Sequence, residues 1–142
     1  MEQFWRLQDK KYPLTRDSVS WPWGMARQDA EAEGLLLNGV SACYSAAALV
    51  KYFETRGGAS DELADVVVFE GEEIDNAPDE ITVVAEAIAA PRRIIAHGTY
   101  SSLAALILPH KDELYEKSPD GRWWIDVLEE EWLQQNMCGE EL

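Results

Sequence analysis

The stretch Asp65–Ile74 reads DVVVFEGEEI and carries the clearest strand pattern in the chain. Its three consecutive valines and its phenylalanine favour a strand, because β-branched and aromatic side chains pack well on a pleated surface. The polar run DNAPDE at 75–80 predicts a turn, and ITVVAEAI at 81–88 predicts the strand that returns beside the first. This hairpin indicates a mainly antiparallel sheet, and the rest of the chain is placed around it.

The segments on either side of the hairpin add strands and helices. QFWRLQ at 3–8 alternates like a strand, LLLNGVSACYS at 35–45 is a strand-like run, and RRIIAHG at 92–98 predicts a further strand that Pro91 opens. Apolar spacing and capping residues predict helices at 26–33, after Ser45, at 99–108 and around Trp132. We therefore expect a single α+β domain over residues 1–142, with a mainly antiparallel sheet and two to four helices.

Length and composition are those of one folded domain in a reducing compartment. The chain has 142 residues, of which 46% are hydrophobic, enough to bury a core without a metal or a disulfide. Cys43 and Cys138 lie 95 residues apart, which suits two cytoplasmic thiols and leaves one long-range disulfide open. The N-terminus lacks a signal-peptide pattern, and no apolar run is long enough to span a bilayer. We expect a cytoplasmic protein without a membrane partner.

The segment GVSACYS at 39–45 has two interpretations. A nucleophile at a strand-to-helix turn would need glycines on both sides of Ser41, and only Gly39 is present. A cysteine nucleophile at Cys43 would need a histidine, and spacing cannot place one beside it. The structural interpretation is favoured: Ser45 caps the following helix, and Cys43 is a small apolar side chain within a strand.

The two histidines and the clustered carboxylates are candidates for metal binding and for acid–base chemistry. His97 and His110 lack the spacing of zinc ligands, so we expect no metal site. Glu70 and Glu72 share a strand face, an arrangement that raises one carboxyl pKa and can support acid–base chemistry. A strand that leaves the core and becomes solvated gives the same pattern, and this interpretation is preferred.

The order of three motifs resembles that of ADP-ribosyltransferases of the Arg–Ser–Glu type. Arg6 lies in FWRLQ, Ser41 in GVSACYS, and the Glu-x-Glu pair follows DVVVF. The resemblance implies an NAD-using enzyme in which Arg6 contacts the NAD phosphates, Ser41 orders the site and Glu72 stabilises the ribosyl cation. GVSACYS departs from the usual Ser-Thr-Ser, and the match covers about 65 residues.

Charge is the strongest compositional feature, and it is unevenly distributed. The net charge is −15, with ten acids and no base in residues 57–91 and ten acids against two bases in 112–142. Such a surface repels phosphate and attracts basic surfaces, which argues against direct nucleic-acid binding. The combination of small size, acidity and many tryptophans resembles phage-encoded anti-CRISPR and anti-restriction inhibitors that mimic nucleic acid.

The leading hypothesis is therefore an acidic protein-binding module without a cofactor. It would inhibit a basic protein or nucleoprotein complex by occupying its nucleic-acid-binding surface. The alternative is the small NAD-using transferase, with Arg6, Ser41 and Glu72 as its catalytic residues. The partner-binding residues predicted from the two acidic blocks are Glu70, Glu72, Glu73, Asp75, Asp79, Glu80, Glu129, Glu130 and Glu131.

Overall fold

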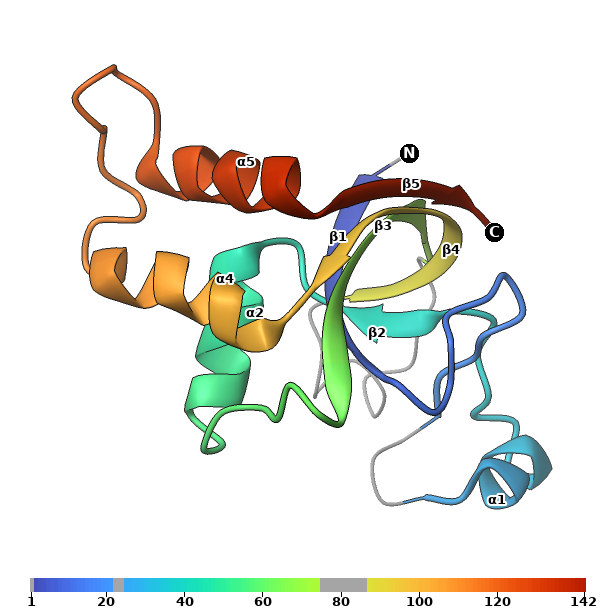
Figure 1. Ribbon diagram of the computed structural model, residues 1–142. Coiled ribbons are helices and arrows are strands. Elements are labelled where there is room, and N and C mark those ends of the chain that lie inside the picture. The colour runs from blue at the N-terminus through green and yellow to red at the C-terminus, as the bar shows by residue number, and fades with distance from the viewer. Residues whose placement is uncertain (1, 22–24, 75–86) are drawn as a thin grey trace.

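Five antiparallel strands and four α-helices make up the described part of the chain, so the predicted α+β class is confirmed. The computed structural model describes residues 2–21, 25–74 and 87–142 (Figure 1). The strands are β1 (Glu2–Asp9), β2 (Val40–Ala42), β3 (Ala64–Glu73), β4 (Ala87–Gly98) and β5 (Met137–Glu141). The helices are α1 (Arg27–Ala32), α2 (Ala46–Glu54), α4 (Tyr100–Ile107) and α5 (Trp124–Asn136), with a 3₁₀ turn at Leu108–His110.

The sheet curls back on itself. Its strand order is β1-β3-β4-β2, with β5 added to β4. The two ends of this path meet, because Trp5 and Cys43 exchange two backbone hydrogen bonds of 2.8 Å and so link β1 to β2. Irregular pairing of β3 with β4 at Phe69 and Gly71 bends both strands, as their curvature in Figure 1 shows.

The curled sheet separates two apolar clusters. The smaller cluster lies on the inner side and includes Phe4 and Phe69, whose rings stack with centroids 5.5 Å apart. The larger cluster lies between the sheet and helices α2, α4 and α5, and it includes Trp5 and Trp132, with ring centroids 5.5 Å apart. Phe4 and Trp5 thus face opposite sides of β1, as the alternation in the sequence predicts.

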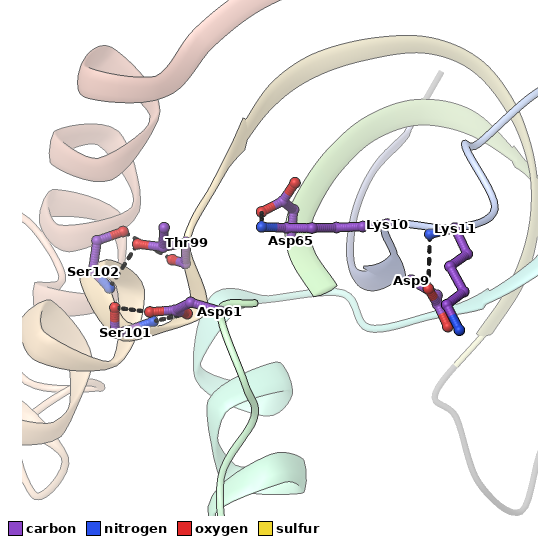
Figure 2. A network of polar contacts seen from close by, with 8 residues as sticks. All are labelled: Asp9, Lys10, Lys11, Asp61, Asp65, Thr99, Ser101 and Ser102. Atoms are coloured by element: carbon purple, nitrogen blue, oxygen red, sulfur yellow. Dashed lines mark hydrogen bonds and ion pairs between the residues drawn. The ribbon is translucent and has the colours of Figure 1, made fainter. Parts of the chain in front are cut away.

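Side-chain caps fix the helices that cover the sheet. Ser45 Oγ accepts the Ala48 amide at 3.1 Å, so the predicted cap of α2 is confirmed, and Thr99 Oγ1 caps α4 by accepting the Ser102 amide at 3.2 Å. Asp61 accepts the Ser101 amide at 3.1 Å and also the Ser101 hydroxyl, and these bonds lower the pKa of its carboxyl group (Figure 2). The loop before β3 is thereby attached to the start of α4.

The Lys10–Asp65 ion pair at 3.7 Å links the end of β1 to the start of β3 (Figure 2). The Asp65 carboxylate is partly exposed, so the pair contributes little to the free energy of unfolding. Asp65 belongs to the first acidic block, residues 57–91. Its charge is therefore paired within the fold, beside the β1–β3 ladder.

Four predictions about strands and turns need correction or lie outside the described residues. Pro91 does not open a separate strand; β4 runs continuously through it, and Pro91 lies opposite Gly71 at the irregularity in the ladder. The run at 35–45 contributes only a three-residue strand, and β5 was not predicted at all. The predicted turn at 75–80 and most of the strand predicted at 81–88 lie outside the described residues.

Candidate functional site

The first acidic block lies at the end of β3, where the strand leaves the core. Glu72 is exposed, with its carboxylate 3.7 Å from Arg92, while Glu70 and Glu73 are partly exposed. Glu73 accepts a hydrogen bond from the hydroxyl of Tyr44, whose ring is about half exposed. These acids are therefore solvated as the sequence indicates, and an exposed aromatic ring lies beside them. Three predicted residues, Asp75, Asp79 and Glu80, lie outside the described residues.

The second acidic patch, Glu129–Glu131 on α5, divides into different environments. Glu130 is exposed and pairs with Arg122, and Glu131 is exposed. Glu129 is largely buried, and its carboxylate accepts the amide of Ala46 at 2.9 Å, at the first residue of α2. Burial raises the pKa of Glu129 to about 7. Glu129 therefore holds α2 against α5, a structural role that a surface patch would not require.

The basic residues between the two acidic blocks are used within the fold. Arg93 pairs with Glu141 on the neighbouring strand, with 3.2 Å between Nε and the carboxylate, and Arg92 approaches Glu72. Both arginines lie on β4, and they partly neutralise the acids of the strands on either side. Glu72 nevertheless stays largely accessible, with its side chain 65% exposed.

A pocket of about 700 Å³ lies between α2 and the seam that joins β1 to β2. Arg6 and Ser41, two residues of the enzyme hypothesis, meet in its wall: Arg6 Nη1 donates to the Ser41 carbonyl at 2.7 Å and to Ser41 Oγ at 2.9 Å. Arg6 Nε donates to Gln8 at 2.7 Å, and burial lowers the pKa of Arg6 to about 10. Between the described residues, no ion pair joins Arg6 to a carboxylate.

Other residues of this pocket were not identified from the sequence. Arg56 lines it together with Tyr52, and the Arg56 guanidinium lies 3.7 Å from the centre of the Tyr52 ring. Tyr52 and Arg56 are four residues apart near the end of α2. This spacing brings side chains together on a helix, so their contact could have been predicted from the sequence. The two arginines and the aromatic ring make this pocket suited to a small anion with a planar group.

Glu72, the third residue of the enzyme hypothesis, does not line the pocket. Arg6 pairs across the β1–β3 ladder with Val67, and Glu72 follows Val67 by five positions. Five residues correspond to about 16 Å of strand. The described lining also includes no carboxylate, so the residues that form the pocket bring the arginine and the serine together without the glutamate.

In the segment GVSACYS, Ser45 and Cys43 have the structural roles that the sequence favours. Ser45 caps α2, and Cys43 is buried at the bridge between β1 and β2. Cys138 is exposed on β5, and the two thiols are not joined to each other. His110 packs its ring on Trp124, with centroids 4.5 Å apart, and its Nδ1 lies 2.5 Å from Glu113.

The fold also assembles a group that sequence spacing did not predict. His97, Cys138 and Glu140 place their potential metal-binding atoms within 4.8 Å of one another, on the exposed side of β4 and β5. Cys138-Gly139-Glu140 was the only local signal, two ligand types on either side of a glycine. The histidine comes from a strand about forty residues earlier, so no local pattern could include it.

Comparisons with models of known protein families, with curated proteins and with solved structures find no match to this chain. None of the described helices is long and apolar enough to cross a membrane. The fold and the geometry of these sites are therefore the basis for assigning a function.

Proposed function

We propose that this chain is an acidic protein-binding module that inhibits its partner by occupying a basic, nucleic-acid-binding surface. The observation that carries the proposal is the exposure of acidic side chains at the end of β3 beside an exposed aromatic ring. Glu72 is exposed there, and Tyr44 contacts Glu73. Spaced carboxylates present charge as phosphates do, and a tyrosine supplies contact area that anchors an interface.

The second patch supports the same proposal through Glu130 and Glu131. Trp123, about half exposed, immediately precedes α5 and follows Arg122, the partner of Glu130. A partly exposed aromatic ring thus lies near acidic side chains in both regions, and at α5 the Lys117 ammonium lies 4.0 Å from the centre of the Trp123 ring. Glu129 is excluded from this surface because it caps α2. The inhibitor would be of the anti-defence type that phages and mobile elements encode, acting on a basic protein or nucleoprotein complex in the cytoplasm.

The test compares two sets of substitutions that remove equal charge. One variant carries Glu70→Gln, Glu72→Gln and Glu73→Gln; the matched control carries Asp29→Asn, Glu31→Gln and Glu33→Gln, which are exposed on or beside α1. Immobilised protein captures partners from bacterial lysate at low and at high salt, and mass spectrometry identifies them. We expect the β3 variant alone to lose the captured protein, because local charge rather than net charge sets the contact.

Salt provides the second readout of the same experiment. The Debye length falls from roughly 10 Å at 0.1 M salt to roughly 3 Å at 1 M, so a contact between charged surfaces should weaken strongly. Glu72→Gln alone should weaken capture only slightly. Equal losses in both triple variants would reduce the charge argument to one about solubility.

The alternative, a small ADP-ribosyltransferase-like enzyme, is favoured by one observation. Arg6 and Ser41 meet in a pocket that also contains Arg56, a suitable place for the phosphates of NAD. Calorimetric titration with NAD, together with an assay for nicotinamide release, tests this function. The transferase hypothesis predicts that the chain binds NAD and releases nicotinamide. Arg6→Met should abolish the binding, and Glu72→Gln should abolish the release. Binding without release would leave the pocket as a ligand site and reject the transferase.

A further inference from the structure

A bulge in the C-terminal strand gathers three different metal-ligand types. Ile94 on β4 lies opposite Glu140 on β5, and Ala96 lies opposite Met137, so β5 has one extra residue between these pairs. Gly139, with a φ of +67°, lies within this bulge. Bulges of this kind re-aim the neighbouring side chains. The pairing of β5 with β4, bulge included, thus lies at the place where Cys138 and Glu140 come close to the side chain of His97.

The separation of the ligand atoms suits one small metal ion. His97, Cys138 and Glu140 offer a nitrogen, a sulfur and an oxygen, all within 4.8 Å of one another. Around a tetrahedral zinc ion, with Zn–N near 2.0 Å and Zn–S near 2.3 Å, such atoms lie about 3.3–3.6 Å apart. Torsions of the three exposed side chains can close a gap of about 1 Å, because no core packing restrains them.

The donor set selects zinc over the alkaline-earth ions. Thiolate and imidazole are ligands that zinc binds well, whereas calcium and magnesium prefer oxygen. The positive charge of the neighbouring Arg93 is offset by its ion pair with Glu141, so the surroundings are compatible with a bound cation. Three protein ligands leave the fourth position of a tetrahedral ion open to water.

We propose that His97, Cys138 and Glu140 form a zinc site that fastens the C-terminal strand β5 to β4. All five residues of β5 are exposed, so little apolar packing attaches this strand to the fold. A metal bound by two residues of β5 and one of β4 would add a link between the strands. Because the ion binds the folded chain, it would also raise the thermal midpoint. The proposal is independent of the acidic-module function.

The experiment titrates the full chain, reduced and treated with chelator, with Zn²⁺ in a calorimeter and with Co²⁺ in a spectrophotometer. We expect one ion per chain, a thiolate-to-cobalt charge-transfer absorption and the visible bands of tetrahedral cobalt. Cys138→Ser should abolish the charge-transfer absorption. His97→Ala and Glu140→Gln should each weaken zinc binding by about tenfold or more, which circular dichroism of the folded variants would separate from misfolding.

Two matched controls distinguish this site from adventitious binding. His110→Ala removes the other histidine of the chain, and Glu141→Gln removes the adjacent carboxylate, which pairs with Arg93. Neither should change the zinc dissociation constant more than about twofold. A cobalt spectrum without thiolate absorption, or equal losses in His97→Ala and His110→Ala, would overturn the site. Zinc that binds without slowing amide exchange in 137–141 would overturn its role as a fastener.

Discussion

Glu129 provides a pH-dependent test of how the helices are joined. Its carboxylate is largely buried between α5 and the start of α2, and burial raises its pKa from the ordinary value of 4.5 to about 7. The native state therefore binds this proton more tightly than the unfolded state. The corresponding stability is present below pH 4.5 and is lost as the pH rises from about 4.5 to about 7.

The magnitude follows from the size of the shift. A change of about 2.5 pH units corresponds to about 3 kcal/mol at 1.36 kcal/mol per unit. Glu129→Gln keeps an oxygen that can accept the Ala46 amide but carries no charge. We expect the stability of Glu129→Gln relative to the wild type to rise by about 2 kcal/mol between pH 5 and pH 8. This value is below the full linkage term because titration has begun at pH 5 and the side chain is partly exposed.

Urea unfolding followed by tryptophan fluorescence at pH 5 and pH 8 measures this difference. Glu131→Gln, an exposed substitution on the same helix, is the matched control and should show little dependence on pH. Glu129→Ala also removes the hydrogen-bond acceptor, so its gain at pH 8 should be smaller by about 1 kcal/mol. A difference between Glu129→Gln and the wild type that is the same at both pH values would show that the Glu129 carboxyl group has no raised pKa in the folded protein.

Two further predictions concern the backbone of α2 and of β3. Ser45→Ala should lower the free energy of unfolding by about 1 kcal/mol, measured by urea unfolding, because the first turn of α2 loses its cap. Gly71→Ala should cost about 2 kcal/mol or more, since its Cβ would lie 2.3 Å from the carbonyl oxygen of Ala90. In Gly121→Ala no atom lies within 4 Å of the new Cβ, and the left-handed φ of +84° alone should cost about 1 kcal/mol. Equal thermal midpoints for Gly71→Ala and Gly121→Ala would contradict this ordering.

Elements with a strong local pattern were predictable from the sequence. The alternation of β1 correctly placed Phe4 and Trp5 on opposite faces, and Ser45 was correctly identified as the cap of α2. The valine run of β3 correctly identified a strand that pairs on both sides, with β1 and with β4. In each case the determining residues are neighbours in sequence, so composition and spacing carry the information.

Features that depend on distant pairing could not be predicted. The residues of β5 are all exposed and show no apolar alternation, so only its ladder with β4 makes this segment a strand. The three consecutive glutamates at 129–131 look equivalent in sequence. The packing of α5 against α2 partly buries the first of them and leaves the other two exposed.

In the candidate sites too, features set by neighbouring residues were predictable and contacts between distant residues were not. The sequence correctly placed solvated acids at the end of β3, because the strand pattern there gives way to charge. The contact of Arg6 with Ser41, however, arises from the curl of the sheet, which brings β1 beside β2. The His97 group likewise requires the pairing of β5 with β4. Resemblance in motif order could associate Glu72 with Arg6, but the ladder separates them.

Competition with duplex DNA for a captured partner tests the central proposal most directly. The chain is immobilised, incubated at low salt with bacterial proteins previously eluted from a DNA column, washed, and then treated with duplex DNA at constant ionic strength. We expect DNA to release a bound protein and the variant neutralised at Glu70, Glu72 and Glu73 not to retain that protein. A captured protein that DNA fails to displace, or that this variant binds as well as the wild type does, would rule out binding through a nucleic-acid-binding surface.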